Sequence, residues 1–144
     1  MTLIELLAVM VMIGVLTAIC APPLWGVLEN VKVARAIADI EALQVDLVGF
    51  ETTKDSLPAD LNAIGRGSML DPWGNPYQYL GYLGQGANPN GARKDRSLHP
   101  LNSDFDLYSM GADGQSTLPI TAKASQDDII RANDGGYVGL ARNY

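Results

Sequence analysis

The sequence predicts an α+β fold in which one long N-terminal α-helix packs on a small C-terminal antiparallel β-sheet with extended loops. The first third of the chain is apolar and then repeats apolar residues every three or four positions, which is the period of a helix. The remainder divides into short alternating segments separated by Gly, Pro and Asn, as in a small sheet. We therefore expect a hydrophobic helix over 1–24 and a globular domain over 25–144.

The N-terminal run is long and apolar enough to cross a membrane. From Leu6 to Trp25 the chain has 20 residues without a charged side chain. At about 1.5 Å per residue, a helix of this length crosses roughly 30 Å of hydrocarbon. A cleavable signal peptide is the competing interpretation, but it needs a basic segment before its apolar core. Here the acidic Glu5 comes first and Pro22 and Pro23 follow, so the sequence favours a transmembrane helix.

The helical pattern resumes beyond the prolines. Its apolar stripe consists of Val33, Ala36, Ile37, Ile40, Leu43, Leu47 and Phe50. The opposite, wetter side carries Lys32, Arg35, Asp39 and Asp46. We expect one helix from about Thr2 to about Thr52, interrupted or loosened near Pro22 and Pro23, because proline has no N–H to donate. Gly14 is a poor helix former and extends the weak region upstream.

Three later segments have the character of strands, namely 77–83, 105–110 and 137–140. The turn-rich run 71–76 precedes the first of them, and a short helical turn is expected after the loop over 56–61. Residues 84–104 are rich in Gly, Asn and Pro and are predicted to form a long surface loop. The helix stripe is then the only apolar surface against which the sheet can pack.

Composition argues against several classes of function. The net charge of −6 argues against general nucleic-acid binding, which depends on clustered Lys and Arg. Arg93, Lys94 and Arg96 are interpreted as a solvated loop surface. The single Cys20 has no partner for a disulfide. The single His99 has no accompanying nucleophile or acid in a catalytic pattern, so we expect no enzyme.

The N-terminal segment resembles the mature start of type IV pilin-like proteins. Thr2-Leu3-Ile4-Glu5, Gly14 and Pro22 all match that family's pattern, and Met1 stands where Phe is usual. The resemblance implies that a prepilin peptidase removes a short leader before Met1 and that the new amino group is N-methylated. We further expect that Gly14, Pro22 and Pro23 mark a segment that loses α-helical hydrogen bonds in a filament.

Glu5 is the principal candidate for an assembly residue. A carboxylate within a bilayer costs on the order of 2.5–3.5 kcal/mol on the translocon-insertion scale, so its presence calls for a partner. The resemblance implies that this partner is the Met1 amine of a neighbouring subunit. The alternative is a Glu5 that lies at the headgroup level and reaches water.

The C-terminal half resembles the major pseudopilin of type II secretion. The matching segments are Asp71-Pro72-Trp73-Gly74-Asn75-Pro76-Tyr77, residues 105–114 and Asp127-Asp128-Ile129. The resemblance implies a calcium ion bound by the side chains of Asp113, Asp127 and Asp128 and by the backbone carbonyls of Met110, Gln115 and Ser125. Carboxylates mixed with carbonyls are the oxygen ligands that Ca²⁺ takes. The spacer 116–126 is longer than the family's usual loop.

The implied function is a structural subunit that polymerises into a helical type IV pilus-like filament, the type II secretion pseudopilus that drives protein export. Its partners would be copies of itself, an inner-membrane assembly platform and minor pilins or pseudopilins. It would lie first in the inner membrane and then in a periplasmic pseudopilus or a cell-surface filament. One alternative is the major pilin of a surface type IV pilus for adhesion, motility or DNA uptake. Another is a membrane-anchored binding module that does not polymerise.

Overall fold

The computed structural model of the chain describes residues 2–84 and 87–144, and for residues 21–23 it describes the backbone only. One helix, α1, spans Leu3–Lys54. The contacts divide the chain into an N-terminal unit, Met1–Lys32, and a C-terminal unit, Val33–Tyr144. The boundary expected after residue 24 therefore falls inside the first of these units.

The N-terminal unit carries the apolar run of α1, and the large apolar side chains described there are exposed. The large apolar residues between Leu3 and Ile19 are 50–82% exposed. This stretch is long and apolar enough to cross a membrane. The helix runs through Pro22 and Pro23 without a break, so the interruption that we expected in the single chain is not observed.

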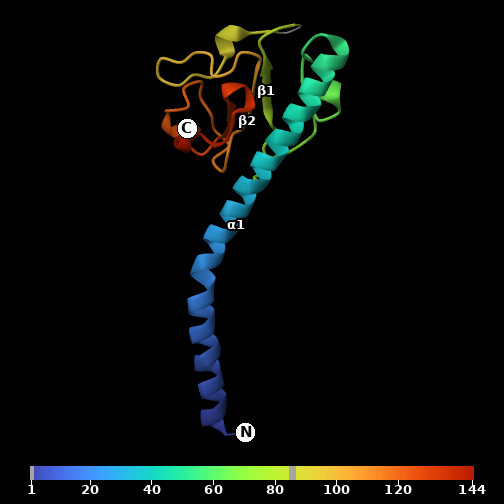
Figure 1. The fold of residues 1–144 in the computed structure, drawn as a ribbon. Coiled ribbons are helices and arrows are strands. Elements are labelled where there is room, and N and C mark those ends of the chain that lie inside the picture. Colours follow the sequence, from blue (N-terminus) through green and yellow to red (C-terminus); the bar gives the residue numbers. More distant parts are fainter. Residues whose placement is uncertain (1, 85–86) are drawn as a thin grey trace. The chain divides into compact units, whose positions relative to one another are not determined.

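The C-terminal part of α1 places its apolar stripe against the sheet, as predicted. Ala36, Ile40, Leu43 and Leu47 are buried, at intervals of three and four residues. They form the main core together with apolar residues of the strands, and Figure 1 shows β1 and β2 beside this part of the helix. The α+β fold with a helix packed on a small antiparallel sheet is thus confirmed.

Over the described residues the sheet has four strands in the order β1-β2-β3-β4, all antiparallel. They are β1 (Gln78–Gly81), β2 (Phe105–Ser109), β3 (Ile129–Ala132) and β4 (Tyr137–Leu140). Three of them match the predicted segments, and the expected helical turn after 56–61 is the 3₁₀ helix η1 at Leu61–Ile64.

Strand β3 was not predicted from the sequence. All four of its residues are buried, so it lacks the alternation of apolar and polar residues that identifies a half-exposed strand. Arg131 also interrupts its apolar character. The strand is recognisable only from its pairing, in which Ile129 faces Ser109 and Leu140 across its two neighbours.

The second face of the sheet is also covered, which corrects the expectation that only the helix packs on it. Ile130 and Ala132 of β3 form a second apolar cluster with Leu101, Ile120 and Ala141. These partners come from the two long loops and from the C-terminal turn. The segment 84–104 is therefore in part an interior layer and not only a surface loop.

Candidate functional site

The N-terminal candidate site is a hydrogen-bonded cap at the start of α1. The Thr2 backbone N–H donates to Glu5 Oε2 at 2.7 Å, and Thr2 Oγ1 donates to the same oxygen at 3.0 Å. A Glu side chain that reaches back to the N-cap N–H is the second half of a capping box. Glu5 is exposed, and Met1 lies outside the described residues. In the single chain, the Glu5 carboxylate is thus held by its own helix end.

Gly14 lies on an open part of the same helix. A Cβ built at this position has no atom within 4 Å apart from the neighbouring helix backbone. The fold of the single chain therefore does not require glycine here. A requirement for glycine at position 14 would have to come from lipid or from another subunit.

The two C-terminal motifs that carried the resemblance are in contact with each other. Asp71 is buried and accepts hydrogen bonds from the backbone N–H of Trp73 and Asn75, at 3.0 and 2.9 Å. Its other oxygen accepts from Ser109 Oγ at 2.6 Å. Asn75 Nδ2 donates to the carbonyl of Gly111 at 3.2 Å. The turn over 71–76 therefore supports the start of the loop that carries the predicted calcium ligands.

Within that loop, two of the predicted calcium ligands are held by backbone N–H groups. Asp127 Oδ2 accepts from the Asp113 N–H at 3.0 Å, and Asp113 Oδ1 accepts from the Gln115 N–H at 2.8 Å. Gly111 has φ +65°, and a Cβ at this position would strike the Asp127 carbonyl. Glycine is thus required at 111 by both backbone conformation and close approach.

Asp128, the third predicted acid, is fully buried and points to a different set of partners. Asp128 Oδ2 lies 2.7 Å from Arg93 Nη2 and accepts from Ser116 Oγ at 2.6 Å. Removal from water raises the pKa of Asp128 to about 6, and the Ser116 hydrogen bond and the Arg93 charge act in the opposite direction. The carboxylate is therefore held by a buried guanidinium and by a hydroxyl.

The three predicted acidic side chains do not gather into a metal-binding group. Among residues 2–84 and 87–144, no three Asp, Glu, His or Cys side chains form a group that could hold a metal ion. The Ser125 carbonyl accepts the Asp128 N–H at 3.3 Å, and Met110 is half-buried at the end of β2. As placed, these residues do not fit a calcium ion, and calcium binding stays a prediction.

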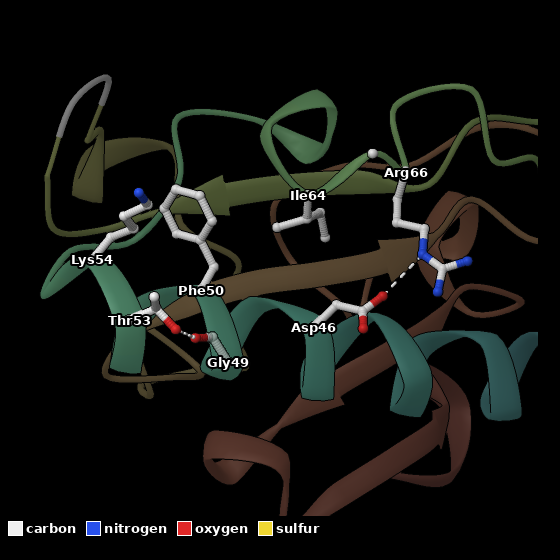
Figure 2. A pocket seen from close by; sticks show the side chains of 8 residues that line it. Asp46, Gly49, Phe50, Thr53, Lys54, Ile64 and Arg66 are labelled. Atoms are coloured by element: carbon white, nitrogen blue, oxygen red, sulfur yellow. Dashed lines mark hydrogen bonds and ion pairs between the residues drawn. The ribbon is translucent and has the colours of Figure 1, made fainter.

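A hollow of about 590 Å³ lies between the last turns of α1 and η1. Figure 2 shows Phe50 and Ile64 on its two sides, with Asp46 and Arg66 at one end. Arg66 Nε donates to Asp46 Oδ2 at 2.9 Å. The Thr53 hydroxyl already donates to the Gly49 carbonyl at 2.8 Å. Among the described residues, those that line the hollow include no Ser, His or Cys and form no pair of nucleophile and base.

Comparison with known proteins points to one group of secretion components. The chain is 32% identical over 135 residues to the type II secretion system core protein G of Pseudomonas aeruginosa, covering 79% of this chain and 83% of that protein. It is 29% identical to the protein of the same name from Aeromonas hydrophila, covering 80% and 83%. It is 30% identical to that from Escherichia coli K12, covering 89% and 86%. No family model and no solved structure matches the chain.

Proposed function

Since this chain belongs to the family of the type II secretion system core protein G, we propose that it is the major subunit of a pseudopilus that drives protein export. In this proposal the subunits polymerise through their N-terminal helices into a helical filament. Its role is structural and not enzymatic. The relatives' names favour this role over that of a surface pilus.

The observation that carries the proposal is the uncovered apolar surface of α1. The following residues are all at least half exposed in the single chain: Leu3, Ile4, Leu6, Leu7, Val9, Val11, Ile13, Val15, Leu16 and Ile19. An apolar surface of this extent requires lipid or other protein around it. Head-to-tail contacts between copies of one helix form an open helical polymer. The same surface therefore serves first against lipid and then against other subunits.

Glu5 gives this packing a defined register. Among the described residues, its carboxylate accepts hydrogen bonds from Thr2 alone, and both donors are neutral. A neighbouring subunit's Met1 amine would supply the positive charge that these donors lack. Forming this pair as the subunit leaves the lipid would neutralise two charges and fix the axial step between subunits.

The remaining partners follow from the same assembly. We propose that a prepilin peptidase exposes the Met1 amine, that this amine is N-methylated, and that an inner-membrane platform and minor pseudopilins begin the filament. Subunits would wait in the inner membrane, since the N-terminal helix is long enough to span it. The filament would then grow into the periplasm.

Replacing Glu5 with Gln in the full chain tests this mechanism. We expect the variant to remain in the membrane fraction but to lose filament assembly by more than about 100-fold. The substitution leaves the neighbouring Met1 amine without its counter-charge, and breaking such a buried pair costs about 3 kcal/mol or more. The assay measures filament mass by sedimentation and electron microscopy. Glu41→Gln is the matched control, because Glu41 is exposed on the same helix.

Export measurements separate the pseudopilus from the surface pilus. Cells that carry Glu5→Gln as their only copy should lose secreted proteins from the medium, whereas Glu41→Gln should leave them unchanged. Normal assembly and export with Glu5→Gln would refute the pairing mechanism. Loss of surface filaments with intact export would instead assign the chain to a pilus.

A further inference from the structure

Arg93 is a buried cation at the junction of the two long loops. It is 2% exposed, although its sequence context of Lys94 and Arg96 suggested a solvated surface. Its backbone N–H donates to Asp106 Oδ2 of β2 at 2.6 Å. Its backbone carbonyl accepts from the Leu101 N–H at 3.1 Å. The backbone therefore holds Arg93 against the sheet before its side chain makes any contact.

The side chain extends from the 84–104 loop to the loop that carries the predicted calcium ligands. Nη2 donates to Asp128 Oδ2 at 2.7 Å, and Nη1 donates to Ser116 Oγ at 2.5 Å. Ser116 Oγ in turn donates to Asp128 Oδ2, which closes a three-membered network. The Arg93 Cζ lies 4.1 Å from the centre of the Tyr108 ring. The guanidinium is thus bonded in its plane and covered on one face by an aromatic ring.

Two buried atoms of this ion pair have no hydrogen-bond partner among the described residues. They are Arg93 Nε and Asp128 Oδ1. In a side-on bidentate pair, the Nε of an arginine donates to one carboxylate oxygen and an Nη donates to the other. Arg93 Nε and Asp128 Oδ1 are the two atoms that would complete such a pair here. A small rotation of the guanidinium that brings Nε to Asp128 Oδ1 would satisfy both atoms without a metal ion.

A calcium ion bound to Asp128 would stand beside this guanidinium. Two cations on one buried carboxylate repel each other strongly where water is excluded. The other two acids are already held by the N–H groups of Gln115 and of Asp113 itself. Each of the three predicted acidic ligands thus has a partner from within the chain.

We propose that the Arg93 guanidinium is the built-in cation of the 111–128 loop, and that it supplies the charge that a calcium ion would otherwise bring to Asp128. The loop then stays folded on the sheet at any calcium concentration. Lys94 supports this arrangement through its backbone, which pairs with Leu118 and Ile120 at 3.0 and 2.9 Å. The inference concerns the loop alone and does not depend on the proposed filament.

The test uses the full chain in detergent micelles. Thermal unfolding of the wild type should have the same midpoint, within about 1 °C, in excess calcium chloride and in excess EGTA, because a ligand that does not bind cannot stabilise by mass action. Arg93→Gln should lower the midpoint by at least about 5 °C, since it leaves a buried carboxylate without its cation. Hydrogen exchange over 111–128 should accelerate at least about tenfold in this variant.

Two further variants make the test specific. Lys94→Gln is the matched control, because Lys94 is exposed and keeps its backbone hydrogen bonds, and it should behave as the wild type. The double variant Arg93→Gln/Asp128→Asn should recover most of the lost stability, because it removes both buried charges. Should Arg93→Gln not fold, Arg93→Lys takes its place, with an intermediate midpoint expected.

Two results would overturn the proposal. The first is a wild-type midpoint that rises in calcium and falls in EGTA by several degrees, which would show that the loop takes a metal. The second is an Arg93→Gln variant that unfolds and exchanges like Lys94→Gln. The wild-type comparison decides whether a metal is needed even if every Arg93 variant fails to fold.

Discussion

Replacing Arg131 with Ala should destabilise the C-terminal unit more than any change to a surface ion pair. Arg131 is 2% exposed in β3 and forms a bidentate pair with Asp104, with distances of 2.7 and 2.8 Å. Its Nε donates to Gln44 Oε1 of α1 at 2.7 Å, and Nη1 donates to the Phe105 carbonyl at 3.0 Å. One side chain thus joins the helix, a loop and two strands.

The size of the effect follows from what the truncation leaves behind. Asp104 would keep its charge without its cation, and Gln44 and the Phe105 carbonyl would each lose a donor. Breaking a buried ion pair costs about 3–5 kcal/mol of stability. Because the Asp104 side chain is 26% exposed, we expect a loss near the lower end of this range, about 3 kcal/mol. For a folded unit of this size that corresponds to a fall in the unfolding midpoint of about 12 °C.

Thermal unfolding of the full chain in detergent, followed by near-ultraviolet circular dichroism, measures this loss. Arg66→Ala is the comparison, because the Arg66–Asp46 pair has a similar distance of 2.9 Å but lies at the surface. It should cost less than about 1 kcal/mol. An Arg131→Ala variant no less stable than Arg66→Ala would refute the view that Arg131 organises the sheet.

Three further predictions concern the loop, pH and the helix. Gly111→Ala should cost at least about 2 kcal/mol, because φ is +65° and the new Cβ meets a backbone carbonyl. Gly65→Ala, at φ +72° in open space, should cost only about 1 kcal/mol in the same denaturant titration. Hydrogen bonds from Ser103, chiefly from its N–H, hold the pKa of Asp134 below its usual value. The stability that Asp134 contributes is therefore complete above the unfolded-state pKa and is lost as pH falls through the lower folded-state pKa. The wild type and Asp134→Asn should thus differ in stability at neutral pH and converge in acid. A filament map should show lost α-helical bonding within residues 10–30, and an unbroken helix there would contradict the expected helix melting.

The sequence was sufficient for the elements whose pattern is local. The stripe from Ala36 to Leu47 has helical spacing, and three strands have turn residues on both sides, so their places were predicted within a few residues. Strand β3 was missed because it is buried on both faces and contains Arg131, and neither property has a local signature. Its existence depends on the neighbours with which it pairs.

The loops were the least predictable part for the same reason. The composition of 84–104 is that of a solvated loop, yet Ala92, Arg93 and Leu101 are buried, and Leu101 belongs to the second apolar cluster. Pairing between Arg93 and Asp128 joins residues 35 positions apart, and no spacing rule connects them. The resemblance identified Asp128 as a residue that needs a cation, and only the structure brings a guanidinium to it.

The most direct test of the account is the distance between the Glu5 carboxylate and the Met1 amine of the adjacent subunit in an assembled filament. A filament map at side-chain resolution measures it. We expect the two groups to lie within about 3–4 Å of each other, as an ion pair requires, with the Thr2 cap opened or shared. The opposite result is a Glu5 that still contacts only Thr2 of its own chain, with the neighbouring amine more than about 8 Å away. At that distance the two charges do not pair directly, so this result would contradict the pairing mechanism.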